Sequence, residues 1–167
     1  RQTERLRKLA AELLDLSRLD AGVPLRSEPV ELVELARSVI AEFEPRGDMR
    51  LQAPQQEWAQ ADPSAVAQIL RNLLDNALRH SAGVAAPPLI RTSMQGHALH
   101  VVVRDHGPGV ADAELAHLTE AFYRTDSARL RSTGGVGLGL HLCALIAQAH
   151  GGRLALRNAA PGLEAEL

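Results

Sequence analysis

Hydrophobic residues recur at helical spacing in several stretches of the chain. In residues 1–20 leucines follow one another at intervals of 3, 4 and 3, the rhythm of a coiled-coil seam: Leu6, Leu9, Leu13 and Leu16. Longer amphipathic patterns predict helices over residues 31–44, 63–81 and 138–149, and a short helix over residues 111–117. We favour residues 1–20 as the end of a helical-bundle dimerisation element, the alternative being a helix packed on its own domain.

Other apolar segments are short or alternate with polar residues, which is typical of strands. Residues 89–95 and 98–105 flank Gly96-His97, so we expect a β-hairpin there. Further extended segments are expected at residues 25–29, 49–53, 153–157 and 163–167, with a short strand beginning near Trp58.

Composition limits the classes of protein that fit. The 167 residues suit one compact domain with an appendage, and 46% hydrophobic residues suffice for a core. A net charge of −2 argues against nucleic-acid binding. No apolar run reaches bilayer length and no signal peptide is evident, so we expect the chain as given to be soluble and cytoplasmic. It begins in mid-pattern and stops abruptly, as a fragment would. Cys143 lies in an apolar helical run and is expected to be buried.

A glycine-rich stretch leads into the last predicted helix, with glycines at Gly134, Gly135, Gly137 and Gly139. Unpaired backbone amides at a helix start favour anions, and glycines allow a ligand to approach closely. The spacing fits neither a P-loop nor a dinucleotide-binding fingerprint. On this stretch alone, a flexible loop before a buried helix remains the alternative.

Two other segments carry candidate ligand-binding groups. Asn72, Asn76 and Arg79 share one face of the predicted helix 63–81, which suits a metal–phosphate group, although a solvated face is the alternative. Asp105 ends a predicted strand and precedes glycines. It could accept a hydrogen bond from a ligand amine such as that of adenine, but a plain turn fits equally.

A polar, arginine-rich segment precedes the glycines. It carries Arg124, Arg129 and Arg131, and we expect it to form a lid that closes over phosphates.

Four segments together resemble, in order and spacing, the N, G1, F and G2 boxes of sensor histidine kinases. They are residues 72–80 (NLLDNALRH), 105–109 (DHGPG), 122–124 (FYR) and 135–140 (GVGLGL). Residues 1–22 resemble the end of the second helix of the dimerisation and histidine-phosphotransfer domain, and residues 23–167 the catalytic ATP-binding domain. The resemblance implies an α+β fold, the two-layer α/β sandwich called the Bergerat fold. Its mixed, mainly antiparallel sheet is covered on one face by three helices.

The resemblance also implies residue roles. Asn76 would bind Mg²⁺, Asn72 and Arg79 would contact phosphates or metal, and His80 would line the nucleotide site. Asp105 would accept from the adenine amine, with Gly107 and Gly109 leaving room for the ring. Catalytic roles would fall to Asn72, Arg124 and Arg129, the arginines meeting the γ-phosphate. The rest of the predicted ATP site comprises Phe122, Tyr123, Thr133, Gly134, Gly135, Val136, Gly137, Leu138, Gly139 and Leu140.

Position 72 separates two mechanisms. ATPases of the gyrase, Hsp90 and MutL type usually carry a glutamate base four residues before the metal-binding asparagine. Asn72 cannot accept a proton at neutral pH, so we infer transfer of the γ-phosphoryl group of ATP to a histidine. A nucleotide-hydrolysing ATPase, an anti-sigma-type serine kinase and a nucleotide-sensing module are the alternatives.

The acceptor histidine is expected upstream of residue 1, so the fragment should bind Mg·ATP without phosphorylating itself. The implied partners are the phosphotransfer helix bundle of the same protein, as a homodimer, and a response regulator whose aspartate receives the phosphoryl group. Membrane attachment, to the bacterial inner membrane, would come only through upstream segments.

Overall fold

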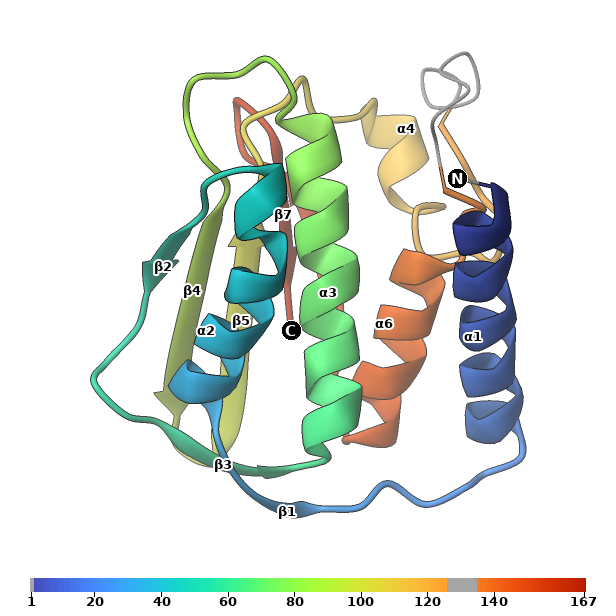
Figure 1. Cartoon of the computed structure of the whole chain (residues 1–167), viewed down its shortest axis with the longest axis vertical. Coiled ribbons are helices and arrows are strands. Elements are labelled where there is room, and N and C mark those ends of the chain that lie inside the picture. Colours follow the sequence, from blue (N-terminus) through green and yellow to red (C-terminus); the bar gives the residue numbers. More distant parts are fainter. Residues whose placement is uncertain (1, 126–134) are drawn as a thin grey trace.

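A five-stranded sheet in the order β2-β4-β5-β7-β6 forms one layer of the molecule, and helices form the other (Figure 1). The computed structural model describes residues 2–125 and 135–167. The strands are β2 (Arg50–Gln52), β4 (Leu89–Gln95), β5 (Ala98–Arg104), β6 (Ala155–Asn158) and β7 (Leu163–Glu166). Only β2 and β4 are parallel, and the other neighbouring strands are antiparallel. The predicted mixed, mainly antiparallel sheet is confirmed.

Three helices cover one face of this sheet, as expected: α2 (Leu32–Phe43), α3 (Pro63–His80) and α6 (Gly139–Ala149). A 3-10 turn, η1 (Glu44–Arg46), continues α2, and the short α4 (Asp112–Leu115) is shorter than predicted. The core lies between the layers because strand residues alternate sides, so that Ile90, Val101 and Val103 meet apolar helix residues.

Asp62 caps the N-terminus of α3. The Asp62 side chain accepts hydrogen bonds from the amides of Ser64 (3.0 Å) and Ala65 (3.1 Å), with Pro63 at the first helical position. Glu31 caps α2 in the same way, and also accepts from the amide of Glu57 at 2.7 Å. That last bond links α2 to a small second sheet.

The second sheet was not predicted as a pair. It consists of β1 (Glu28–Glu31) antiparallel to β3 (Trp58–Ala61). Sequence indicated both extended segments separately. Their pairing depends on α2 and β2 returning the chain to the same place, which local patterns do not encode.

The first helix, α1 (Gln2–Asp20), packs beside α6 (Figure 1). Its packed face contains the buried Glu12 together with Leu16 and Leu19, which lie against the core, and of these three Leu16 belongs to the predicted leucine seam. Leu6 (66% exposed) and Leu13 (46%) remain at the surface. One face of the helix therefore packs on its own domain, and the role of residues 1–22 in dimerisation remains a prediction.

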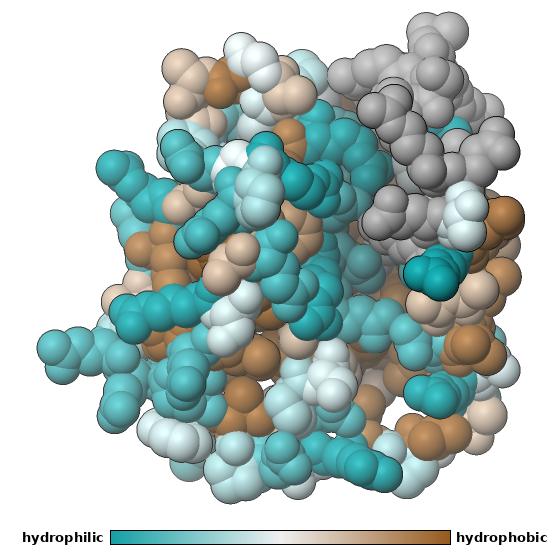
Figure 2. All heavy atoms as spheres, viewed as in Figure 1, coloured by the Kyte–Doolittle hydropathy of each residue, from teal (hydrophilic) through white to brown (hydrophobic). Residues whose placement is uncertain are grey.

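Two further observations concern this helix. Figure 2 shows hydrophobic surface along the edge where α1 lies, consistent with the exposed side chains of Leu6, Leu13 and Leu14. On the opposite side, the Gln68 side chain donates to Asp15 Oδ2 at 2.6 Å, which ties α1 to α3. Within the described part of the chain, no helix is both long and apolar enough to cross a membrane.

Candidate nucleotide-binding site

The N-box helix meets the start of the glycine-rich helix through Asn72. Its amide nitrogen donates to the carbonyl oxygen of Gly139 at 3.4 Å. A Cβ on Gly139 would lie 3.7 Å from Cγ of Asn72, an ordinary van der Waals contact with that side chain. Asn76, one turn further along α3, is half-buried and shares this face of the helix. The predicted N-box and G2-box segments are therefore neighbours.

Arg79 lies between an acidic residue of its own helix and the glycine-rich segment. Its Nη2 donates to Asp75 Oδ2 at 2.6 Å, while Arg46 of η1 contacts the other oxygen of Asp75 at 2.8 Å. A Cβ on Gly135 would lie 3.2 Å from Nη1 of Arg79. The shared carboxylate thus holds a cationic group where the glycine-rich segment reaches α3.

Asp105 is 4% exposed and is held by backbone amides from two segments. Its Oδ1 accepts from the amide of Gly107 at 2.9 Å and from the amide of Leu163 at 3.1 Å. Both bonds end on the same oxygen, so Oδ2 is the atom suited to accept from a ligand. The carboxylate is oriented before any ligand arrives.

The G1 segment lies directly against the end of α3. A Cβ on Gly107 would clash with the carbonyl oxygen of His80, and the amide of His106 donates to Ser81 Oγ at 3.2 Å. Only glycine permits this approach at position 107, because any side chain would push the segment away from α3.

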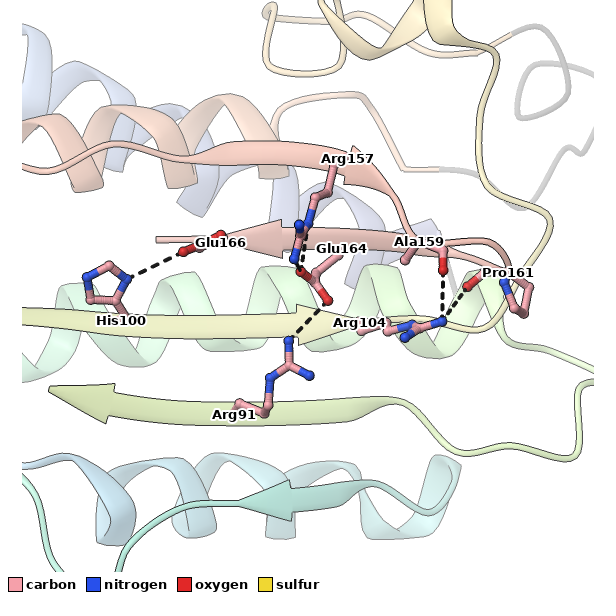
Figure 3. A network of polar contacts seen from close by, with 8 residues as sticks. All are labelled: Arg91, His100, Arg104, Arg157, Ala159, Pro161, Glu164 and Glu166. Carbon is pink, nitrogen blue, oxygen red and sulfur yellow. Dashed lines mark hydrogen bonds and ion pairs between the residues drawn. The ribbon is translucent and has the colours of Figure 1, made fainter. Parts of the chain in front are cut away.

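The turn between β6 and β7 supports the same region from the sheet side (Figure 3). The Arg104 guanidinium donates to the carbonyl oxygens of Ala159 (2.9 Å) and Pro161 (3.2 Å). On the open face of the sheet, the buried carboxylate of Glu164 is paired with Arg91 and Arg157. These contacts fix the strand that supplies the Leu163 amide.

The F-box and G2-box segments pack backbone to backbone. The amide of Phe122 donates to the carbonyl oxygen of Gly137 at 2.9 Å, and a Cβ on Gly137 would lie 2.6 Å from the carbonyl oxygen of Tyr123. The Nδ1 atom of His141, in the first turn of α6, lies 2.8 Å from the carbonyl oxygen of Thr119. The segment before the predicted lid is thereby attached to the start of α6.

Most predicted site residues can be placed. The structure brings together the N-box, G1, F-box and glycine-rich segments around the ends of α3 and α6. Arg124 and Tyr123 are half-buried, and Phe122 is 60% exposed. Leu138 is 1% exposed, so its side chain belongs to the core and only its backbone is suited to a ligand. Arg129, Thr133 and Gly134, like Arg131, lie outside the described residues.

Residues that shape the site were also missed from sequence. Asp75 precedes Arg79 by one helical turn, a spacing that could have indicated the ion pair. Ser81 and Asn158 contact the G1 segment from distant parts of the chain, and no local signal marks them.

Cys143 of α6 is fully buried, as expected. Burial raises the pKa of its thiol to about 12, partly offset by a hydrogen bond with Asn72. The thiol also lies 3.8 Å from the carbonyl oxygen of Ile69. It acts as a packing residue between α3 and α6, not as a nucleophile.

Comparison with known proteins agrees with this arrangement. Residues 61–165 match the family described as histidine kinase-, DNA gyrase B-, and HSP90-like ATPase. The sensor protein SphS of Synechococcus elongatus is 37% identical over an alignment 170 residues long, gaps included. The alignment covers 94% of this chain and 41% of SphS. The chain therefore spans less than half the length of this relative.

Solved structures of similar fold include full-length ShkA in complex with AMPPNP, with a TM-score of 0.81 and 28% identity, covering 96% of this chain and 35% of ShkA. The histidine kinase AdeS of Acinetobacter baumannii, at 24% identity, supports the fold alone, with a TM-score of 0.80 over 99% of this chain and 78% of AdeS. With the family match over residues 61–165, these likenesses show that the chain belongs to the histidine kinase-, DNA gyrase B- and HSP90-like ATPase family, as a catalytic ATP-binding domain of the histidine kinase type.

Proposed function

We propose that this chain is the catalytic domain of a sensor histidine kinase, which binds Mg·ATP and passes the γ-phosphoryl group to a histidine of the dimerisation domain. The observation that carries the proposal is the pre-oriented carboxylate of Asp105, held through Oδ1 beside the close contact of Gly107 with His80. ShkA, a structural relative, was solved with the ATP analogue AMPPNP, which supports the choice of nucleotide.

The described residues fit an adenine nucleotide at both of its ends. Asp105 Oδ2 would accept a hydrogen bond from the exocyclic amine, since Oδ1 is already occupied by two amides. At the other end, Arg79 and the amides that begin α6 provide positive charge for phosphates. A hydrogen-bond acceptor at one end and cationic groups at the other define a direction for the bound molecule.

Asn76 and Asn72 are the proposed residues nearest the reacting phosphate. An asparagine carbonyl oxygen suits Mg²⁺, which would neutralise phosphate charge when bound. Asn72 donates to Gly139, so its amide holds the start of α6 against α3 instead of activating water. We infer that catalysis rests on positioning and on charge stabilisation by Arg79, Arg124 and Arg129.

Partners and location follow from the same proposal. In the full-length protein the phosphotransfer helix bundle would donate the acceptor histidine, and a response regulator would receive the phosphoryl group. Sensor kinases among the relatives support this assignment. Residues upstream of this chain would supply any membrane attachment.

Two measurements test the proposal. Titration calorimetry of the chain with AMPPNP, with and without Mg²⁺, should give magnesium-dependent uptake of about one nucleotide per chain. The chain should then transfer label from γ-labelled ATP to the separately supplied phosphotransfer bundle of the full-length protein. The label should be acid-labile, as a phosphohistidine is, and absent from the chain incubated alone.

The outcomes separate the competing functions. Label released mainly as inorganic phosphate would indicate an ATPase, whereas acid-stable label would indicate a serine kinase. Nucleotide binding with neither product would leave a sensing module. No binding to the folded chain would refute the proposed function altogether.

A further inference from the structure

Asn158, the last residue of β6, makes a set of contacts that none of the predicted boxes contains. Its Oδ1 accepts from the amide of Val110 at 3.0 Å, and its Nδ2 donates to the carbonyl oxygen of the same residue at 2.8 Å. The nitrogen also donates to Asp112 Oδ1 at 3.0 Å. One side chain therefore satisfies both backbone groups of Val110 and the first residue of α4.

The same side chain lies against the second glycine of the G1 segment. A Cβ on Gly109 would lie 2.7 Å from Oδ1 of Asn158. Gly109 has a φ of +72°. The backbone therefore turns where it contacts the side-chain amide of Asn158. The hydrogen bonds between Asn158 and Val110 join residues 48 apart in sequence, so they can form only in the folded chain.

The G1 loop, residues 105–111 between β5 and α4, is consequently held at its two ends by different parts of the fold. At Asp105 and Gly107 it is fixed by β7 and by the end of α3. At Val110 and Asp112 it is fixed by β6 through Asn158. A loop held at both ends keeps its shape in the absence of ligand, which reduces the entropy lost on binding.

We propose that Asn158 is a positioning residue of the nucleotide site. It holds the G1 loop and the start of α4 in the shape that admits adenine. This inference rests on the proposed function as regards the nucleotide, but the loop contact itself can be tested in nucleotide-free protein. Because Asn158 acts through Val110 and Asp112, it need not touch the ligand.

An asparagine is chemically specific at this position. Its oxygen accepts from an amide while its nitrogen donates to a carbonyl and a carboxylate. Asn158→Ala removes all three bonds. Asn158→Asp keeps the acceptor, loses the donor and places a second carboxylate beside Asp112, where like charges repel. The aspartate variant should thus bind nucleotide more weakly than the alanine variant.

The rescue experiment uses Asp112→Asn. In the double variant Asn158→Asp/Asp112→Asn, the charge repulsion is gone and the new amide at position 112 can donate to the new carboxylate. Asp112→Asn alone should cost little, since its amide oxygen still accepts from Asn158. Recovery in the double variant therefore isolates the pairwise contact.

Two measurements are made on each variant of residues 1–167. Backbone amide exchange at Val110, without nucleotide, should accelerate about tenfold in Asn158→Ala, the usual worth of one lost hydrogen bond. The dissociation constant for Mg·AMPPNP should rise about tenfold in that variant and further in Asn158→Asp. In the double variant, the dissociation constant should return most of the way from the Asn158→Asp value to the Asn158→Ala value.

Arg153→Ala is the matched control, because Arg153 is exposed and lies two residues before β6, outside the contacts that support the site. It should leave both readouts unchanged. The thermal midpoint of Asn158→Ala should stay close to that of Arg153→Ala, which separates positioning from general loss of stability.

The failures are distinguishable. Unchanged Val110 exchange in Asn158→Ala would overturn the loop contact whatever the nucleotide result. Accelerated exchange with unchanged nucleotide affinity would overturn the positioning role. If the unaltered chain takes up no nucleotide, the proposed function and the role of Asn158 in it both fail, and altered exchange would leave a purely structural contact.

Discussion

Asp105 makes it possible to separate stability from ligand recognition at a single side chain. Its Oδ1 accepts two backbone amides, those of Gly107 and Leu163, and the residue is 4% exposed. Asp105→Ala would leave two buried N–H groups without acceptors, each costing about 1–3 kcal/mol. The free energy of unfolding should fall by roughly 2–6 kcal/mol, a large part of the stability of an ordinary domain.

Asp105→Asn should behave differently. The amide oxygen can still accept both N–H groups, so the stability loss should be only about 1 kcal/mol, for the lost charge assistance. At the second atom an N–H donor replaces Oδ2 and faces the donor amine of adenine. Losing that bond and opposing two donors should weaken ATP binding by about 30-fold or more, which corresponds to about 2 kcal/mol.

Urea denaturation followed by circular dichroism measures the first quantity and titration calorimetry with Mg·AMPPNP the second. Inosine triphosphate, which carries an oxygen where adenine has its amine, supplies the complementary ligand. The original chain should prefer the adenine nucleotide, and Asp105→Asn should narrow or reverse that preference. The reasoning fails if both variants lose equal stability, or if Asp105→Asn keeps its affinity and preference for adenine.

Two further predictions concern backbone geometry and a buried thiol. Gly162→Ala should cost about 3 kcal/mol by urea denaturation, because Gly162 has a φ of +96° and a Cβ there would clash with the carbonyl oxygen of Asp105. Gly96→Ala, with a φ of +63° and open space around it, is the control and should cost about 1 kcal/mol; equal losses would exclude the clash as the cause. Burial raises the pKa of Cys143 from 9.0 to about 12, so its contribution to stability is complete below pH 9 and is lost as pH rises toward 12. The free energy of unfolding should therefore fall more steeply in the unaltered chain than in Cys143→Ala, by up to about 1.4 kcal/mol per pH unit; parallel curves between pH 9 and 11 would contradict this.

Local patterns determined the helices and strands because their causes are local. The cap at Asp62, the apolar stripe of α3 and the turn at Gly96 each depend on residues a few positions apart. The motifs of the N, G1, F and G2 boxes could likewise be recognised, since their order and spacing lie within the sequence itself.

The packing of α1 shows where such reasoning ends. Of the predicted leucine seam, Leu16 packs against the core, whereas Leu6 and Leu13 are exposed and the buried Glu12 lies on the packed face. Periodicity identifies apolar faces, but it does not state which neighbour covers them. That choice depends on where α6 and α3 lie, which is a property of the assembled fold.

For the nucleotide site too, some features follow from the sequence and others depend on the tertiary structure. Sequence alone determined which chemical groups are available: the asparagines of α3, the carboxylate of Asp105 and the glycines before α6. Only the tertiary structure decided that Leu163 and Gly107 share one oxygen of Asp105, and that Asn158 holds the G1 loop across 48 residues. These contacts join segments brought together by the pairing of β5, β7 and β6. The physical reason is that a hydrogen bond depends on separation in space, whereas a sequence pattern records separation along the chain.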